Sequence, residues 1–93
     1  MTTHAVVMMR ITNPESLAQY REQAADALAR HGGEVVQASP DPITLEGAPV
    51  MPDVLAVLRF PDRAAAEAWK ADPELQSIHE LRRASGGSDI ILM

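Results

Sequence analysis

The sequence contains no cysteine, and among its 93 residues there is only one tryptophan, one tyrosine and one phenylalanine. Without cysteine the chain forms no disulfide, no thiolate zinc site and no thiol nucleophile, while the redox compartment stays undetermined. Hydrophobic residues make up 46% and charged residues 23%, which is typical of a folded globular protein. We expect a single domain over residues 1–93, because chains of this length do not divide into several cores.

Basic residues are also scarce. The chain has 8 Lys and Arg against 13 Asp and Glu, giving a formal net charge of −5. The basic residues are scattered, and Arg82-Arg83 is their only adjacent pair. Nucleic-acid binding depends on clustered cations, so we expect no nucleic-acid partner.

Long hydrophobic runs are absent. The longest, around Val6 and Ile90, are far too short to span a bilayer. Residues 1–4 contain no basic segment followed by an apolar run, so no secretory signal is expected. These observations predict a cytoplasmic protein that does not associate with membranes.

Hydrophobic periodicity predicts alternating strands and helices. Strands are expected at residues 4–11, 34–38, 43–46, 54–60 and 89–93, with a loop at 47–52. Helices are expected at residues 14–31, 63–71 and 73–84. Asn13-Pro14 and Asp72-Pro73 each place a capping side chain before a proline suited to the first helical position. Gly32-Gly33 supplies a residue that can close the first helix in the left-handed conformation.

This order of elements indicates an α+β fold. Two strand–helix–strand units normally interleave into a four-stranded antiparallel sheet with the helices on one face, which is the ferredoxin-like βαββαβ arrangement. The apolar strand residues, however, lie on both faces: Val6 and Met8 oppose Val7 and Met9. A sheet that is apolar on both faces needs cover on both, so we predict a homodimer through the sheet face. The alternative is an apolar outer face that a monomer tolerates.

Several motifs resemble one bacterial family, the domain of unknown function family 1330, within the dimeric alpha-beta barrel superfamily. The matching residues span nearly the whole chain: Tyr20, His31-Gly32-Gly33, Leu45-Glu46-Gly47, Phe60-Pro61, Ala66, Trp69, Pro73-Glu74 and Arg82. The resemblance implies a dimeric alpha-beta barrel. The family has no settled reaction, and relatives in the superfamily include cofactor-free monooxygenases, muconolactone isomerases and haem enzymes.

The sequence departs from the family pattern where aromatic residues would line a cleft. Glu34-Val35 follows the glycine pair in place of a basic or aromatic residue, and Lys70 and Leu75 stand where the family usually has aromatics. The aromatic lining of any cleft is therefore thinner in this chain.

Two candidate catalytic residues are His79 and Tyr20. His79 and Arg82 are three residues apart and share a helix face, where they could present a proton donor or acceptor beside a fixed cation. The alternative is a helix surface on which they pair with Glu80 or Glu74. Tyr20 could hydrogen-bond a ligand from the inner face of the first helix, or it could be a packing group whose hydroxyl reaches the rim.

The other candidates are ligand-binding residues: Glu46, Arg59, Trp69 and Arg82. Glu46 precedes Gly47, which suits either close backbone approach to a ligand or a simple turn. Arg59 interrupts an apolar strand, and it could bind an acidic group or pair with Glu46 across neighbouring strands. Trp69 fits the core as well as a ligand platform.

Arg10 and the remaining histidines suggest no further site. Antiparallel pairing of the first and third strands would place Arg10 at the opposite end of the sheet from Arg59. His31 is explained by a helix C-terminus and His4 by a strand start. The histidines are dispersed with no carboxylate at ligand spacing, so neither a metal site nor a cofactor is expected.

Two functions remain open. The first is a homodimer whose helix–sheet cleft binds a small carboxylated or enolisable metabolite, and which could convert it without a cofactor. The second is a non-catalytic structural or interaction dimer in which Tyr20, Glu46 and Arg59 form a buried network. Converging polar groups around an open cleft would favour the first, and a filled, fully paired interior the second.

Overall fold

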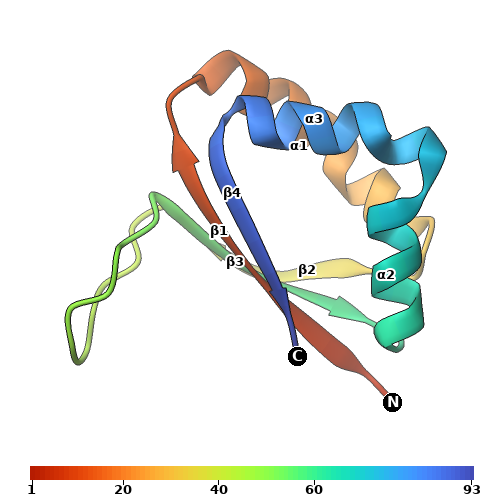
Figure 1. Cartoon of the computed structure of the whole chain (residues 1–93), viewed down its shortest axis with the longest axis horizontal. Helices are drawn as coiled ribbons and strands as arrows, with labels where there is room; N and C mark the ends of the chain where they lie inside the picture. Colours follow the sequence, from red (N-terminus) through yellow and green to blue (C-terminus); the bar gives the residue numbers. More distant parts are fainter.

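The computed structural model describes residues 1–93 and confirms the ferredoxin-like arrangement. The elements are β1 (Thr3–Ile11), α1 (Pro14–Ala29), β2 (Glu34–Ser39), β3 (Val54–Phe60), α2 (Arg63–Ala71), the 3-10 turn η1 (Pro73–Leu75), α3 (Gln76–Ala84) and β4 (Gly86–Leu92). The strands form one antiparallel sheet in the order β2-β3-β1-β4. All helices lie on one face of this sheet (Figure 1).

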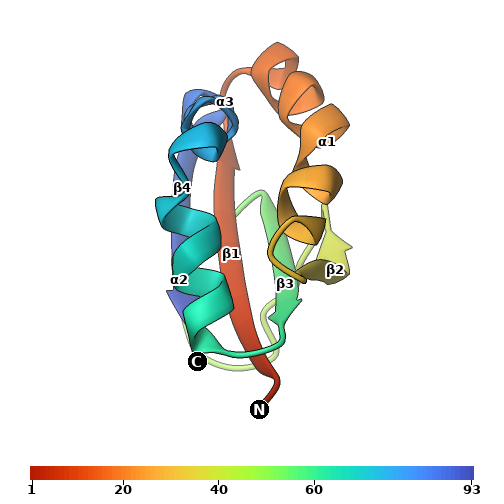
Figure 2. The ribbon, with the colours of Figure 1, turned by 90° about the vertical axis from the view of Figure 1, so that its right-hand side faces the viewer.

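The helix layer divides into two halves (Figure 2). Helix α1 lies over β3 and β2, whereas α2 and α3 follow one another over β1 and β4. The two halves meet above the middle of the sheet, which is where the polar side chains described below come together.

The predicted helix starts and the first helix end are confirmed. The Asn13 side chain accepts a hydrogen bond from the Ser16 amide, and the Asp62 side chain accepts one from Ala65. Gly32 follows α1 with φ of 73°, the left-handed conformation that closes a helix without strain at glycine. The predicted second helical stretch begins as the 3-10 turn η1, and the Asp72 side chain accepts a bond from the Glu74 amide there.

The strand predicted at residues 43–46 is wrong. These residues have no regular structure, because the segment leaves the sheet after β2 and returns only at β3. Prolines at positions 40, 42, 49 and 52 remove the amide donors that a ladder would need. Consecutive strands β2 and β3 pair directly with each other, so no position in the sheet is left for an additional strand between them.

The last strand begins earlier than predicted, at Gly86 rather than Asp89. Gly86 has φ of 152°, and a Cβ atom there would collide with the Arg10 carbonyl oxygen of β1. Only glycine fits at this contact. The chain therefore turns from α3 into β4 within one residue, Ser85.

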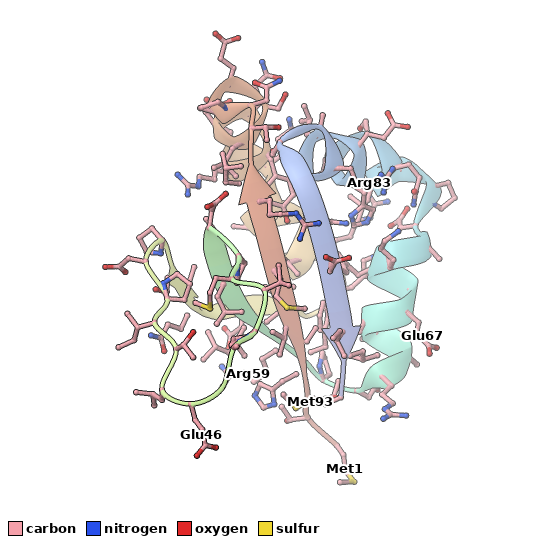
Figure 3. The ribbon with its side chains drawn as sticks, turned by 60° about the vertical axis from the view of Figure 1, so that its left-hand side comes forward. Met1, Glu46, Arg59, Glu67, Arg83 and Met93 are labelled. Carbon is pink, nitrogen blue, oxygen red and sulfur yellow. The ribbon has the colours of Figure 1, made fainter.

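Residues 40–53, hereafter the arm, project from the sheet on the side opposite the helices (Figures 1 and 3). The base of the arm is fixed by Asp53. Its amide donates to the Met9 carbonyl at 2.8 Å, and its carboxylate accepts from the Ile11 amide at 2.8 Å. The arm thus has a defined anchor on β1.

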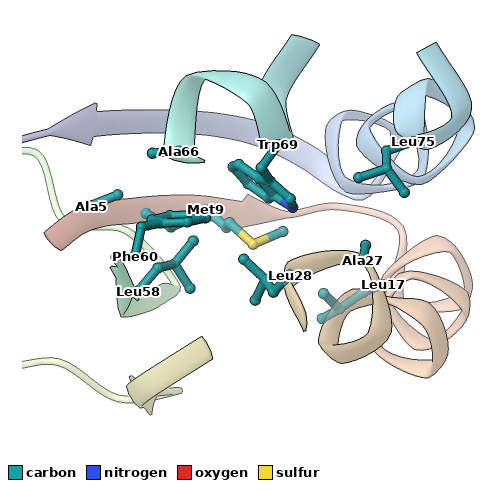
Figure 4. Packing of buried hydrophobic residues seen from close by; sticks show 11 residues of the cluster. Ala5, Met9, Leu17, Ala27, Leu28, Leu58, Phe60, Ala66, Trp69 and Leu75 are labelled. Carbon is teal, nitrogen blue, oxygen red and sulfur yellow. The ribbon is translucent and has the colours of Figure 1, made fainter. Parts of the chain in front are cut away.

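The hydrophobic core lies between the sheet and the helices (Figure 4). It contains 11 buried residues: Ala5, Val7, Met9, Leu17, Ala27, Leu28, Leu58, Phe60, Ala66, Trp69 and Leu75. Trp69 is among them, as the sequence predicts, and its ring packs 5.5 Å from that of Phe60. None of the helices combines the length and the apolar character needed to cross a membrane.

Candidate functional site

Polar side chains meet where the two halves of the helix layer adjoin. We call this group the central cluster: Tyr20 from α1, Trp69 from α2, His79 and Arg82 from α3, and Ser88 from β4. His79 is 0% exposed and Arg82 is 2% exposed. They share one face of α3, as predicted, but that face is turned inward.

Both ring nitrogens of His79 are engaged. Nε2 lies 3.0 Å from the Trp69 carbonyl oxygen, and Nδ1 lies 2.8 Å from Nη1 of Arg82. A carbonyl oxygen only accepts and a guanidinium only donates. His79 is therefore neutral, with its proton on Nε2 and its Nδ1 lone pair directed at Arg82.

The surroundings of His79 favour the neutral ring. Burial lowers the pKa of His79 below its ordinary value of 6.5, and the hydrogen bond to Trp69 opposes this shift. The positive charges of Arg82, Lys70 and Arg83 lower the pKa further. The charge state and the hydrogen-bond geometry agree, so His79 serves as an acceptor that orients Arg82.

Arg82 is a buried cation without an anion. Its Nε donates to the Ser88 hydroxyl at 3.2 Å, and its Cζ lies 5.3 Å from the Trp69 ring centroid and 5.7 Å from that of Tyr20. The aromatic faces and the C-terminal end of α3 stabilise positive charge in part. No carboxylate forms a salt bridge with Arg82. A buried charge normally has such a partner, so the cluster lacks one negative group.

A second polar atom in the cluster is unpaired. The indole Nε1 of Trp69 is buried and has no hydrogen-bond partner. Buried donors of this kind are usually satisfied, and an unsatisfied one destabilises the fold by roughly 1–3 kcal/mol. The unpaired groups of the cluster are thus donors or cations, and what they lack is an acceptor.

Two open clefts flank the central cluster. The α1 cleft, about 220 Å³ in volume, lies between α1 and the β2–β3 half of the sheet. Twelve of its 13 lining residues are hydrophobic; Tyr20 is among them, and Arg21 is the exception. None of the hydrogen bonds of the cluster reaches the Tyr20 hydroxyl. The cleft is therefore apolar, the Tyr20 phenol forms part of its lining, and the Arg82 guanidinium packs against that phenol outside the cleft.

The second cleft, the α2 cleft, has a similar volume of about 220 Å³. It lies between α2 and the β1–β4 half of the sheet and is lined by Trp69, Phe60 and Lys70, among others. It meets the cluster only through the indole of Trp69, and the α1 cleft meets it only through Tyr20; the α1 cleft is preferred because the Tyr20 hydroxyl takes part in none of the hydrogen bonds of the cluster.

The structure brings four of the six predicted site residues together and separates the other two. Tyr20, Trp69, His79 and Arg82 belong to the central cluster. Glu46 is exposed at the tip of the arm, and Arg59 is exposed on the outer face of the sheet (Figure 3). The buried network of Tyr20, Glu46 and Arg59 is therefore wrong.

The ion pairs expected for these residues are also different. Arg59 pairs with Glu34 on the adjacent strand rather than with Glu46, because the strand that would have carried Glu46 does not form. Glu80 is exposed and Glu74 pairs with Arg30, so neither pairs with the buried His79 and Arg82. The distant placement of Arg10 is confirmed, since it opposes Gly87 at the far end of β1.

Two residues next to the site were not predicted. Ser88 was missed because β4 was expected to start after it, and strand alternation from Gly86 would have placed it inward. Arg21 was missed because it follows Tyr20 on the exposed side of α1. Its position four residues after the buried Leu17 is the signal that places it beside the apolar stripe.

An ion cluster outside the site joins α1 to the start of η1. The Asp72 carboxylate lies 2.9 Å from His31 Nε2 and 3.2 Å from Arg30 Nε, and Arg30 also pairs with Glu74. The hydrogen bond from His31, followed by that from the Glu74 amide, lowers the pKa of Asp72 below its ordinary value of 3.8. The cluster ties the two halves of the helix layer together.

Solved structures share this fold at low sequence identity. A protein of unknown function from Rhodopseudomonas palustris is 22% identical, with a TM-score of 0.77 over 99% of this chain and 80% of that chain. A dimeric ferredoxin-like protein of unknown function from Jannaschia sp. CCS1 is 19% identical, with a TM-score of 0.67 over 100% and 98%. SnoaB from Streptomyces nogalater, described as a cofactor-independent oxygenase, is 18% identical, with a TM-score of 0.68 over 99% and 90%.

A search of curated proteins finds no match to this sequence. One family profile does match, and it covers residues 2–93, nearly the whole chain. Its description is domain of unknown function (DUF1330). The resemblance expected from the motifs is thus confirmed, and the chain belongs to the DUF1330 family.

Proposed function

We propose that the protein is a homodimer that binds a small molecule with an apolar body and one acidic group, a carboxylate or an enolate, in the α1 cleft. The observation that carries this proposal is Arg82, a buried guanidinium with no carboxylate partner. A ligand anion at Tyr20 would bring negative charge near this cation without touching it, because Arg82 packs behind the phenol and does not line the cleft. The hydrophobic lining of the cleft would hold the rest of the molecule.

The residues take distinct roles in this proposal. Tyr20 lines the cleft, and its hydroxyl is free to donate a hydrogen bond to the ligand oxyanion. Arg82 supplies the stabilising charge behind the phenol ring. His79 and Ser88 hold the guanidinium in place, so they are positioning residues. Arg21 adds a second cation to the lining of the cleft.

The apolar lining of the α1 cleft and the unengaged Tyr20 hydroxyl support binding over a purely structural role. Both nitrogens of His79 are engaged, so the cluster has no free base, and the phenol and the cation would stabilise a ligand that enters the cleft already as an enolate. The fold neighbour SnoaB is described as a cofactor-independent oxygenase, which makes such chemistry a reasonable second step to assay after binding.

Two matched probes test this proposal: salicylate, which is an aromatic carboxylate, and salicylamide, its neutral analogue. Salicylate should raise the melting temperature of the wild-type protein by at least about 2 °C at saturation, and salicylamide should raise it less. Tyr20→Phe should reduce the shift. The exposed helix variant Ala18→Ser should keep it.

Native mass spectrometry of gently purified protein provides a second readout. It reports the subunit count together with any ligand that remains bound. Added mass on the wild-type dimer that is lost in Tyr20→Phe would support the proposal. A clean mass, combined with no thermal shift from either probe, would contradict it and favour a structural role.

A further inference from the structure

The arm exposes apolar side chains that nothing in the chain covers. Ile43 is 80% exposed, Leu45 93%, Val50 86% and Met51 40%. Glu46 and Asp41 are its only charged residues before the anchoring Asp53. Contiguous apolar surface of this kind usually marks an interaction site.

Three features restrict the shape of the arm. Four of the seven prolines of the chain lie within it, and proline restricts the backbone. Asp53 anchors its base to β1, and the Thr44 hydroxyl contacts the Met51 sulfur at 3.0 Å across its two limbs. Such restraints reduce the conformational entropy that the arm would lose on binding.

The arm and the outer face of the sheet form one continuous concave surface. A hollow of about 430 Å³ lies between them, lined by arm residues together with Met8 of β1 and Leu55 of β3. Both residues belong to the apolar outer face, which Val6, Val57 and Ile91 complete by their register in the sheet. Whatever covers the outer face therefore also meets the arm.

The size of the sheet shows why the arm is needed. Four strands of about seven residues project roughly 440 Å² per face. A stable protein interface usually buries about 800 Å² on each partner. A flat sheet of this size is smaller than such an interface, and the arm is the adjoining apolar surface that can extend it.

The total surface of the chain supports the same conclusion. Its accessible surface is 5842 Å², whereas a compact monomer of this mass has about 5,300 Å². The excess of roughly 500 Å² agrees with an arm that projects from the sheet.

We propose that the arm, residues 40–53, packs against a second copy of this chain and forms part of the dimer interface together with the outer face of the sheet. This inference rests on the homodimer of the proposed function. A two-fold pair uses the same patch on both subunits, so each arm flanks the sheet of the partner. The apolar side chains of the arm become buried only in the dimer.

Sedimentation equilibrium over a dilution series tests the contribution of the arm. The variant Ile43→Ser/Leu45→Ser/Val50→Ser should raise the dimer Kd at least about tenfold, because it removes the apolar contacts without touching the sheet. Ala18→Ser on α1 is the control and should leave the Kd unchanged. An unchanged Kd in the triple variant would overturn the proposal while leaving a dimer through the sheet face intact.

Thiol labelling tests the location of the arm directly. The natural chain has no cysteine, so Leu45→Cys introduces a single reporter. Its reaction with a soluble disulfide reagent should be at least about tenfold slower at dimer concentrations than after dilution to monomer, given the protection that burial provides. Equal rates in a persisting dimer would overturn the proposal. A wild-type chain that is monomeric throughout would overturn it together with the homodimer, and salicylate binding would then test the cleft separately.

Discussion

Both faces of the sheet carry apolar side chains but have different cover, and the outer face also carries the exposed ion pairs of Arg59 with Glu34 and of Arg10 with Asp89. On the inner face, Val7 and Leu58 are 5% and 4% exposed beneath the helices. On the outer face, Val6 and Leu55 come from the same strands and are only partly buried. The inner face is completed by the chain itself, and the outer face is not. An apolar pattern on both sides of a strand therefore indicates that both faces of the sheet need to be buried. The structure shows that the helices of one chain bury only the inner face.

The difference in burial between the two faces can be tested by making the same substitution on each face of β3. Leu58→Ala should lower the free energy of unfolding by about 2–5 kcal/mol, because it leaves a cavity in the core. Leu55→Ala should lower that of the monomer by less than about 1.5 kcal/mol, because water already reaches this position. Urea unfolding at low protein concentration measures both values.

The same pair should behave differently at high concentration. At high protein concentration, Leu55→Ala should lower the free energy of unfolding by more than it does at low concentration, because stability then includes dimer association. Equal effects of the two variants at low concentration would show that the outer face is as well covered as the inner one within a single chain. That result would remove the reason for a second copy.

The pH dependence of stability should originate on the helix-covered side. Because burial lowers the pKa of His79, the unfolded chain takes up a proton below pH 6.5 while the folded chain resists it. Stability should be fully present above pH 6.5 and should fall as the pH drops toward the lowered pKa. Tyr20, Lys70, Arg82 and Arg83 are the titratable or charged neighbours, and none of them offers a negative charge near neutral pH.

His79→Gln provides the matched variant. Glutamine can still donate to the Trp69 carbonyl and accept from Arg82, but it does not titrate. It should flatten the melting temperature between pH 7.5 and about 5.5. His4→Gln, on the outer face, should keep the wild-type slope. An unchanged slope in His79→Gln would mean that the ring is charged in the folded protein.

The ion cluster at Asp72 should give the smallest effect. Its depressed pKa contributes stability above about pH 3.8, and this contribution is lost as the pH falls through the folded value. Asp72→Asn should therefore lower the melting temperature at pH 7 and have less effect at pH 3. Asp89→Asn on the outer face breaks an exposed pair with Arg10, so it should change the melting temperature less. A larger loss in Asp89→Asn would contradict this order.

Much of the fold could be predicted from local signals. Helix capping depends on contacts between residues that are close in sequence, so a single sequence can show it. Examples are Asn13-Pro14, Asp72-Pro73 and Gly32. The false strand at residues 43–46 came from apolar residues that face no other strand. Their partner, by the inference above, belongs to another chain, and a single sequence does not show that.

The site was harder to predict from the sequence, because it depends on how the helices pack in the tertiary structure. His79 and Arg82 are polar helix residues, and such residues usually face solvent. Only the meeting of α1, α2 and α3 above the sheet buries them. The exposure of Glu46 and Arg59 follows from the course of the arm and the register of β3, both of which depend on contacts distant in sequence.

The close approach of Gly86 to β1 has a consequence for how binding specificity could change. Because only Ser85 separates α3 from β4, Arg82 lies at the end of the helix and Ser88 near the start of the strand, on either side of a short, sterically fixed turn. The cation is held by the side chains of His79 and Ser88 from these two elements, and it stacks against only one residue of the α1 cleft, Tyr20. For the ligand proposed above, substitutions along α1 other than at Tyr20 should change the selectivity for its apolar body while the cation keeps its position.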